Sequence, residues 1–178
     1  MAKKAFPLSE VYRLLEPGAV VMISTALGGR PNIMTMSWHT MIDFSPPLVG
    51  LVIGDQSHTF RVLKRTRECV INIPTARLLG QAVACGNHSG RTVDKFRAFG
   101  LTPVRASCVK APMIAECYAN LECKVVHQAL AARYNFFIGK VVRAWIDPKQ
   151  KATDTFRHLG KGMFMTGGTR IRTRSKMK

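Results

Sequence analysis

Short stretches in which apolar and β-branched side chains dominate recur along this chain, and they predict a protein built mainly of β-strands. Turn-forming Gly, Pro, Asn and Asp residues separate these stretches from one another. The last two stretches flank a short segment that we expect to form a hairpin. The predicted strands are residues 19–27, 32–42, 48–53, 69–73, 119–128 and 134–146.

Helix signals are short and lie between these strands. Ser9, Ser57 and Thr75 each stand where a side chain caps a helix, and residues 92–99 predict one more helical turn or two. The intervals between strands are mostly too short for the crossover helices that parallel strands require. The pattern therefore favours an antiparallel barrel or sandwich with short peripheral helices.

The predicted strand 32–42 has two unlike faces, because successive side chains of a strand point in opposite directions. One face is apolar and typical of a core. The other carries hydroxyl groups and an imidazole, and the pattern leaves two interpretations open: a solvated outer face, or a row of donors and acceptors facing a polar planar ligand. The apolar face holds Met34, Met36, Trp38, Thr40 and Ile42, and the other holds Ile33, Thr35, Ser37, His39 and Met41.

Two further segments have the composition of an anion site. Ser57, His58 and Thr59 enter a helix that carries Arg61 and Arg65, and free N–H groups at a helix N-terminus attract anions. Residues 87–96 gather small donors and cations in a loop. An ordinary cap on a basic surface helix explains the first segment equally well.

The composition fits a chain with a sizeable core. The 178 residues are 47% hydrophobic, as expected of one globular domain, and Lys and Arg outnumber Asp and Glu by 27 to 10, a formal charge of +17. Such a charge suits nucleic acid or phosphorylated small molecules. We expect a barrel domain at residues 1–148 and an extension with a basic tail at 149–178.

The sequence lacks the motifs of several common classes of catalytic and binding site. The glycine-rich nucleotide fingerprints, the HExxH zinc motif and the nucleophile elbow are absent, and the five His are scattered, so no metal site is predicted. The five Cys contain no C-x-x-C pair and fit a reducing cytoplasm. No secretory leader and no apolar run long enough to span a bilayer is visible.

Six short motifs, in order and at consistent intervals, resemble those of one known family. The chain resembles the flavin reductase-like, FMN-binding split-barrel proteins, specifically the flavoredoxin-like branch, over roughly residues 15–147. The motifs are residues 32–38 (NIMTMSW), 45–49 (SPPLV), 57–59 (SHT), 70–74 (VINIP), 89–96 (SGRTVDKF) and 137–142 (FIGKVV).

The resemblance implies a mainly β, antiparallel Greek-key split barrel of about six strands that forms homodimers with FMN near the interface. It also implies an enzyme that passes electrons from NADH or NADPH through FMN to a flavin, a metal ion or a protein. The flavin carries out the redox chemistry itself, so no side chain is predicted to be catalytic. A membrane or nucleic-acid partner is not expected.

The resemblance also implies which residues contact FMN. Asn32, Met34, Thr35, Ser37 and Trp38 are expected along the isoalloxazine ring and ribityl chain. The phosphate is expected at Ser57, His58 and Thr59, with Ser89 and Lys95 as further contacts, and Asn72 is expected near the ring edge.

The chain departs from the family pattern at residues 131–135, where relatives often carry a histidine on the nicotinamide side. Direct reduction by NAD(P)H is therefore an open question. His127 and Cys85 are candidates to approach the flavin, each against a purely structural role. Two other functions stay open: a basic nucleic-acid-binding barrel without flavin, and an FMN-binding sensor without reductase activity.

Overall fold

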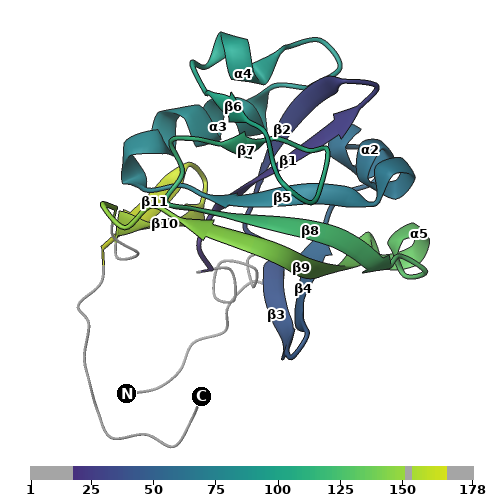
Figure 1. Ribbon diagram of the computed structural model, residues 1–178. Helices are drawn as coiled ribbons and strands as arrows, with labels where there is room; N and C mark the ends of the chain where they lie inside the picture. The colour runs from purple at the N-terminus through teal and green to yellow at the C-terminus, as the bar shows by residue number, and fades with distance from the viewer. Residues whose placement is uncertain (1–17, 151–153, 168–178) are drawn as a thin grey trace, which may run out of the picture.

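The computed structural model describes residues 18–150 and 154–167 of the chain (Figure 1). The predicted helix after Ser9 and the basic tail lie outside these described residues. The barrel occupies the middle of the molecule, with α3 and α4 packed on one side and the β10–β11 hairpin at its edge (Figure 1). No helix of the described segments is both long and apolar enough to cross a membrane.

The described elements follow one another as short strands with brief helical insertions. The barrel strands are β1 (Val21–Leu27), β2 (Arg30–Met36), β3 (His39–Phe44), β4 (Pro47–Val52), β5 (Glu68–Ile73), β8 (Ala119–His127) and β9 (Phe136–Ile146). The helices are α2 (His58–Thr66), η2 (Ala76–Leu78), α3 (Leu79–Asn87), α4 (Lys95–Ala98) and α5 (Ala131–Tyr134). The remaining strands are β6 (Pro103–Val104), β7 (Met113–Ile114), β10 (Phe156–Gly160) and β11 (Met163–Thr166).

Seven strands form one antiparallel sheet in the order β2-β1-β5-β8-β9-β4-β3. The two edge strands, β2 and β3, are consecutive in the chain, so the sheet closes on itself with its opening between them. Inside lies a core that includes Ile23, Leu51, Leu63 and Phe137. The predicted antiparallel split barrel with short peripheral helices is confirmed.

The prediction of a single strand over residues 32–42 is wrong. The strand breaks after Met36, and the chain passes from β2 to β3 through Ser37 and Trp38. At the break the Trp38 carbonyl accepts a hydrogen bond from the Val52 amide at 3.0 Å, so the chain leaves β1 and joins β4. This crossing from one sheet edge to the other is what opens the barrel.

Of the two interpretations of the strand 32–42, the solvated outer face is wrong for residues 32–36, because both faces of β2 are covered. Met36 belongs to the barrel core, whereas Ile33 packs with Leu78, Ala82 and Phe96 of the outer layer. The hydroxyl of Thr35 donates to the Ala82 carbonyl of α3 at 2.6 Å. Beyond the break the chain is no longer covered, since residues 40–44 of β3 are exposed.

The β10–β11 hairpin is an element that the strand prediction omitted. Phe156 is fully buried in the outer core, and its carbonyl accepts a hydrogen bond from the Val20 amide at 2.8 Å. Phe164 packs edge-on against Phe156 at 6.0 Å between ring centroids. These contacts hold the hairpin beside the start of β1. In this position the hairpin reaches the open side of the barrel.

Candidate active site

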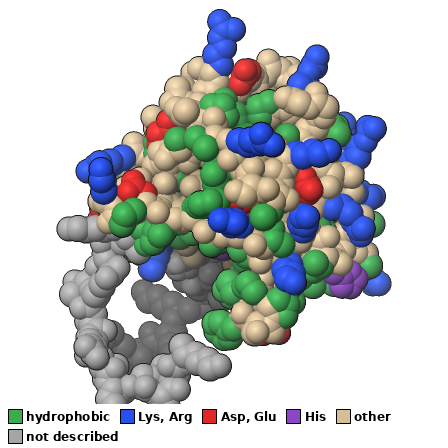
Figure 2. Space-filling model, viewed as in Figure 1, with side chains coloured by type: hydrophobic (Ala, Val, Ile, Leu, Met, Phe, Trp, Pro, Cys, Tyr) green, Lys and Arg blue, Asp and Glu red, His purple; other side chains and the backbone are tan. Residues whose placement is uncertain are grey.

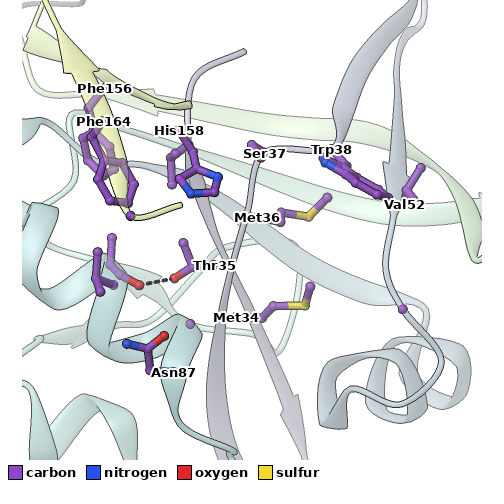
Figure 3. A pocket seen from close by; sticks show the side chains of 16 residues that line it. Met34, Thr35, Met36, Ser37, Trp38, Val52, Asn87, Phe156, His158 and Phe164 are labelled. Carbon is purple, nitrogen blue, oxygen red and sulfur yellow. Dashed lines mark hydrogen bonds between the residues drawn. The ribbon is translucent and has the colours of Figure 1, made fainter. Parts of the chain in front are cut away.

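Two adjoining cavities follow strand β2 on the open side of the barrel. The first, which we call the aromatic cavity, has a volume of about 590 Å³. Trp38 lies at one end of it and His158 and Phe164 of the hairpin at the other, with Thr35 and Met36 of β2 between them (Figure 3). Its lining residues are Val20, Met34, Thr35, Met36, Ser37, Trp38, Val52, Gly54, Ala82, Val83, Gly86, Asn87, Phe156, His158, Gly162 and Phe164.

The second, which we call the cationic cavity, has a volume of about 380 Å³. It shares Met34, Thr35, Gly86 and Asn87 with the first, so the two cavities are continuous along β2. Both volumes are in the range of small-molecule sites. The lining residues are Asn32, Met34, Thr35, Gln56, Ser57, His58, Thr59, Cys85, Gly86, Asn87, His88, Ser89, Gly90, Arg91 and Lys95.

Helix α2 begins at the cationic cavity. Ser57 is its N-cap, and the Ser57 hydroxyl accepts a hydrogen bond from the Phe60 amide at 3.1 Å, as the sequence predicted. The amides of His58 and Thr59, in the first turn, are among those that an α-helix leaves without an intrahelical partner. The positive end of the helix dipole therefore faces the cavity, and no acidic residue of the first turn offsets it.

The side chains around this helix end add positive charge. Lys95 is buried, and its ammonium donates to the carbonyls of Ile33 at 2.7 Å and Cys85 at 2.6 Å. Burial lowers the pKa of Lys95, and the Cys85 thiol opposes that effect. The pKa of His58 is lowered by burial and then by the positive charges of Arg91, Lys95 and Arg61. No Asp or Glu is among the lining residues in residues 18–150 and 154–167, so this cavity suits an anion.

Asn32 and Thr59 form a buried pair at the floor of this cavity. The Asn32 amide nitrogen donates to the Thr59 hydroxyl at 2.9 Å, which leaves the Thr59 proton available to a further acceptor. The Asn32 carbonyl oxygen is buried and has no hydrogen-bond partner among the residues that the structure describes. An unpaired buried acceptor costs free energy, so a ligand that places a hydroxyl or amide donor beside this oxygen would be favoured.

Gly90 shows how closely the floor is built. A Cβ at this position would lie 1.9 Å from the Asn32 Oδ1 atom and 3.2 Å from the His58 Cδ2 atom. Only a residue without a side chain leaves Asn32 in place. The loop after α3 therefore forms a cradle around the Asn32 amide.

The structure brings all but one of the predicted site residues to these cavities. Asn32, Ser57, His58, Thr59, Ser89 and Lys95 line the cationic cavity, Ser37 and Trp38 line the aromatic cavity, and Met34 and Thr35 line both.

Asn72 is the exception, and the prediction that it lies beside the flavin needs correction. It is fully buried in β5 and lines neither cavity. Its amide nitrogen donates to the Met22 carbonyl at 2.8 Å and the Ser24 hydroxyl at 3.0 Å. Its carbonyl oxygen accepts from the Ile114 amide and from Asn120. These partners occupy both ends of the side chain, which joins β1, β5, β7 and β8.

Sequence reasoning missed several residues of the site. Arg91 lies inside the motif at residues 89–96 and Gln56 directly before the motif at 57–59, but neither side chain is among the predicted contacts. Phe156, His158 and Phe164 come from the hairpin, whose signal was the alternation of residues 156–160 before a glycine-containing turn.

The remaining histidine and cysteine candidates have separate places. His39 contacts the Ala19 carbonyl through Nε2 at 2.8 Å and so ties β3 to the segment before β1. His127 is exposed, and its Nδ1 accepts from the Ala129 amide. Cys85 does line the cationic cavity, but it is buried, and burial raises the pKa of its thiol to about 11 against the opposing charge of Lys95. A thiol of this kind is a weak nucleophile at neutral pH.

Comparison with known proteins identifies the family. The model of the flavin reductase like domain matches residues 13–163. An uncharacterized protein of Archaeoglobus fulgidus is 36% identical over 137 residues, 75% of this chain and 77% of that one. The fold is similar to flavoredoxin of Desulfovibrio vulgaris (Miyazaki F), with a TM-score of 0.85, 23% identity and coverage of 99% of this chain and 98% of that chain.

A second solved structure is an FMN-binding domain of a flavin reductases-like enzyme from Shewanella baltica OS155. It has a TM-score of 0.82 and 25% identity, and the match covers 96% of this chain and 97% of that chain. The sequence resemblance described above is therefore confirmed: the chain belongs to the flavin reductase-like family.

Proposed function

We propose that this protein binds FMN in the two joined cavities and passes electrons from NADH or NADPH through it to a flavin, a metal ion or a protein. Membership of the flavin reductase-like family supports a flavin-related oxidoreductase, and an FMN-binding structural neighbour supports FMN. The observation that carries the proposal is the pairing of an apolar, aromatic cavity with a cationic one along a single strand. FMN is likewise a flat apolar ring joined by a polar chain to a phosphate.

The residues present fit this cofactor. Within the described part of the chain the Asn32 carbonyl oxygen lacks a hydrogen-bond partner, and a ribityl hydroxyl is a donor of the kind it needs. The α2 N-terminus, the Thr59 hydroxyl and the cations around His58 are suited to a phosphate dianion. The cradle at Gly90 keeps this floor open.

The two ends of the site would hold different parts of FMN. Ser57, His58, Thr59, Ser89 and Lys95 would hold the phosphate, with Asn32 at the ribityl chain. Met34, Thr35, Ser37 and Trp38 would flank the ring. When bound, FMN supplies the electron-transfer chemistry, and the protein orients it, covers its apolar surface and excludes water. No side chain is assigned as a general acid, base or nucleophile.

We propose in addition that the protein works as a homodimer through the surface of β3 and β9. Large apolar side chains are exposed there, among them Phe44 at 68% and Ile146 at 63%. Strands β3 and β4 extend from the barrel as a long hairpin (Figure 1). A monomer would leave this apolar surface in water, and surfaces of this kind mark interaction sites.

Light scattering during gel filtration tests the dimer. The wild type is expected at twice the mass of the chain, and Phe44→Glu is expected to shift it toward the monomer, because a carboxylate would be buried unpaired in the interface. Lys64→Glu on α2 is a charge-changing control at an exposed position outside β3 and β9. A wild type that elutes as a monomer at micromolar concentration contradicts the assembly.

The visible absorption spectrum of purified protein, mixed with FMN, dialysed and then treated anaerobically with NADH and NADPH, tests the function. Retained flavin that bleaches with either nucleotide supports a reductase and identifies its donor. Retained flavin that stays oxidised points to a carrier or sensor. Failure to retain flavin overturns the proposal and favours a nucleic-acid binder, although Lys and Arg are scattered over the visible face rather than gathered in one stripe (Figure 2).

We propose a cytoplasmic location, because the five Cys contain no C-x-x-C pair and suit a reducing compartment. Fractionation of cells that express the tagged full-length chain checks this location.

A further inference from the structure

Arg91 bridges the two loops that form the outer end of the cationic cavity. Its guanidinium donates to the Gln56 carbonyl at 3.3 Å, and its backbone amide donates to the Ser89 hydroxyl at 3.3 Å. Both Arg91 and Gln56 are exposed and line the cavity, so the bridge lies at its solvent side. One wall, before α2, is thereby joined to the other, after α3.

The charge inside this end is concentrated. His58, Lys95 and the α2 N-terminus face the same small volume, and Arg91 and Arg61 are near enough to lower the pKa of His58. A terminal phosphate monoester brings close to two negative charges to one point at neutral pH, with roughly 1.5–2 charges per group. A phosphate within a dinucleotide brings one charge, because its second oxygen is esterified. The cavity therefore matches a terminal phosphate better than an internal one.

We propose that Arg91 is a specificity-determining residue that makes this site select FMN over FAD. The inference rests on the proposed function, since it concerns which flavin the same site takes. The Arg91–Gln56 bridge spans the solvent side of the cavity, where the guanidinium would contact a terminal phosphate. FAD would have to break the bridge so that its second phosphate and adenosine could leave the cavity, and its inner phosphate would bring only one charge to the site.

Dissociation constants of the full-length protein for FMN, FAD and riboflavin, from quenching of flavin fluorescence at fixed salt, test this assignment. Wild type is expected to bind FMN at least about tenfold more tightly than FAD, the worth of one charge-assisted hydrogen bond. Arg91→Ala is expected to reduce this preference by about tenfold. The FMN phosphate loses a cationic partner, whereas the second phosphate and adenosine of FAD no longer have to break the Arg91–Gln56 bridge. Arg91→Lys, which keeps the charge but not the planar fork, is expected between the two.

Arg65→Ala is the matched control, because it removes an exposed arginine of α2 that lines neither cavity. It should leave the ratio of the two constants unchanged. Riboflavin, which has no phosphate, should bind weakly to every variant. Circular dichroism and thermal unfolding establish that Arg91→Ala is folded.

The outcomes separate the inference from the function on which it rests. A wild type that binds FMN and FAD equally, or an Arg91→Ala variant with an unchanged ratio, overturns the role of Arg91 and leaves the flavin protein standing. An equal fall of the ratio in Arg65→Ala also overturns it, because net charge would then be the cause. A wild type that binds no flavin overturns both.

Discussion

Gly90→Ala is the most direct test of the cationic cavity. The new Cβ would lie 1.9 Å from Asn32 Oδ1 and 2.5 Å from Asn32 Cγ, far inside contact distance. Gly90 does not have a left-handed φ, so alanine imposes no backbone strain, and the perturbation is steric. The Asn32 amide has to turn away, which breaks its hydrogen bond to Thr59 and moves its carbonyl oxygen out of position.

The expected effect follows from two costs. Overpacking at a tight site costs about 1–3 kcal/mol, and one buried hydrogen bond contributes about 0.5–1.5 kcal/mol. Part of the overpacking cost lowers the stability of the fold rather than the affinity for FMN. We therefore expect FMN affinity to fall by roughly 10–100-fold, since each 1.4 kcal/mol is a factor of ten. Fluorescence titration measures the affinity, and thermal unfolding with and without FMN measures the stability that the cofactor adds.

Gly80→Ala provides the control, because a Cβ there meets nothing within 4 Å and the residue lines neither cavity. Alanine in the exposed part of α3 is expected to leave FMN binding intact and to favour the helix slightly. If Gly90→Ala binds FMN with wild-type affinity while remaining folded, the flavin does not lie against Asn32. The assignment of the cationic cavity to the phosphate and ribityl chain would then be wrong.

Two further substitutions examine single side chains. Thr59→Ala should weaken FMN binding by about tenfold, because it removes a donor and strands the Asn32 amide nitrogen, and an equal loss of riboflavin affinity would argue against a phosphate contact. Glu122→Gln should lower the free energy of unfolding by about 2–4 kcal/mol, because the fully buried carboxylate accepts hydrogen bonds from the Trp145 indole and the Ser107 amide. Urea denaturation measures this, and an unchanged midpoint would refute it. Burial raises the pKa of Glu122 but these hydrogen bonds lower it overall, so its stabilising effect is present above the unfolded pKa and lost as pH falls through the folded one.

Local signals predicted the helix cap and the alternation of side chains at the site, because both depend on neighbours in the sequence. Ser57 caps α2 through an amide three residues ahead, and this spacing is visible in any helix start. Alternation of side chains along β2 sends Met34 and Met36 to one face and Thr35 to the other. These two regularities predict the local geometry, whereas the assignment of these residues to FMN is what the family resemblance implies.

Long-range pairing decided the parts that the sequence did not reveal. Nothing local distinguishes Ser37–Trp38 from a continuing strand, since the break is set by the partner amide of Val52 and by His39 binding the Ala19 carbonyl. Asn72 carries the motif of a ligand-binding residue, yet all its partners are protein groups, most of them on other strands. A buried amide looks the same in a sequence whether a ligand or the backbone satisfies it.

The last prediction concerns His58, whose protonation should be coupled to the phosphate. Burial and the charges of Arg91, Lys95 and Arg61 lower its pKa, so the folded protein binds this proton less readily than the unfolded chain does. The stability of the ligand-free protein should therefore decline as pH falls from the ordinary histidine pKa through the lower folded value. A bound phosphate dianion reverses the local field, raises the pKa of His58 and makes FMN binding take up a proton near pH 6.

Calorimetric titration with FMN near pH 6, in buffers of different ionisation enthalpy, measures the number of protons exchanged. The phosphate itself releases protons on binding as a dianion, so the difference between wild type and His58→Gln isolates the histidine. Riboflavin should show no such difference, because it brings no charge to the helix N-terminus. If the wild type and His58→Gln exchange the same number of protons with FMN, the phosphate does not bind beside His58, and the cationic cavity serves another anion.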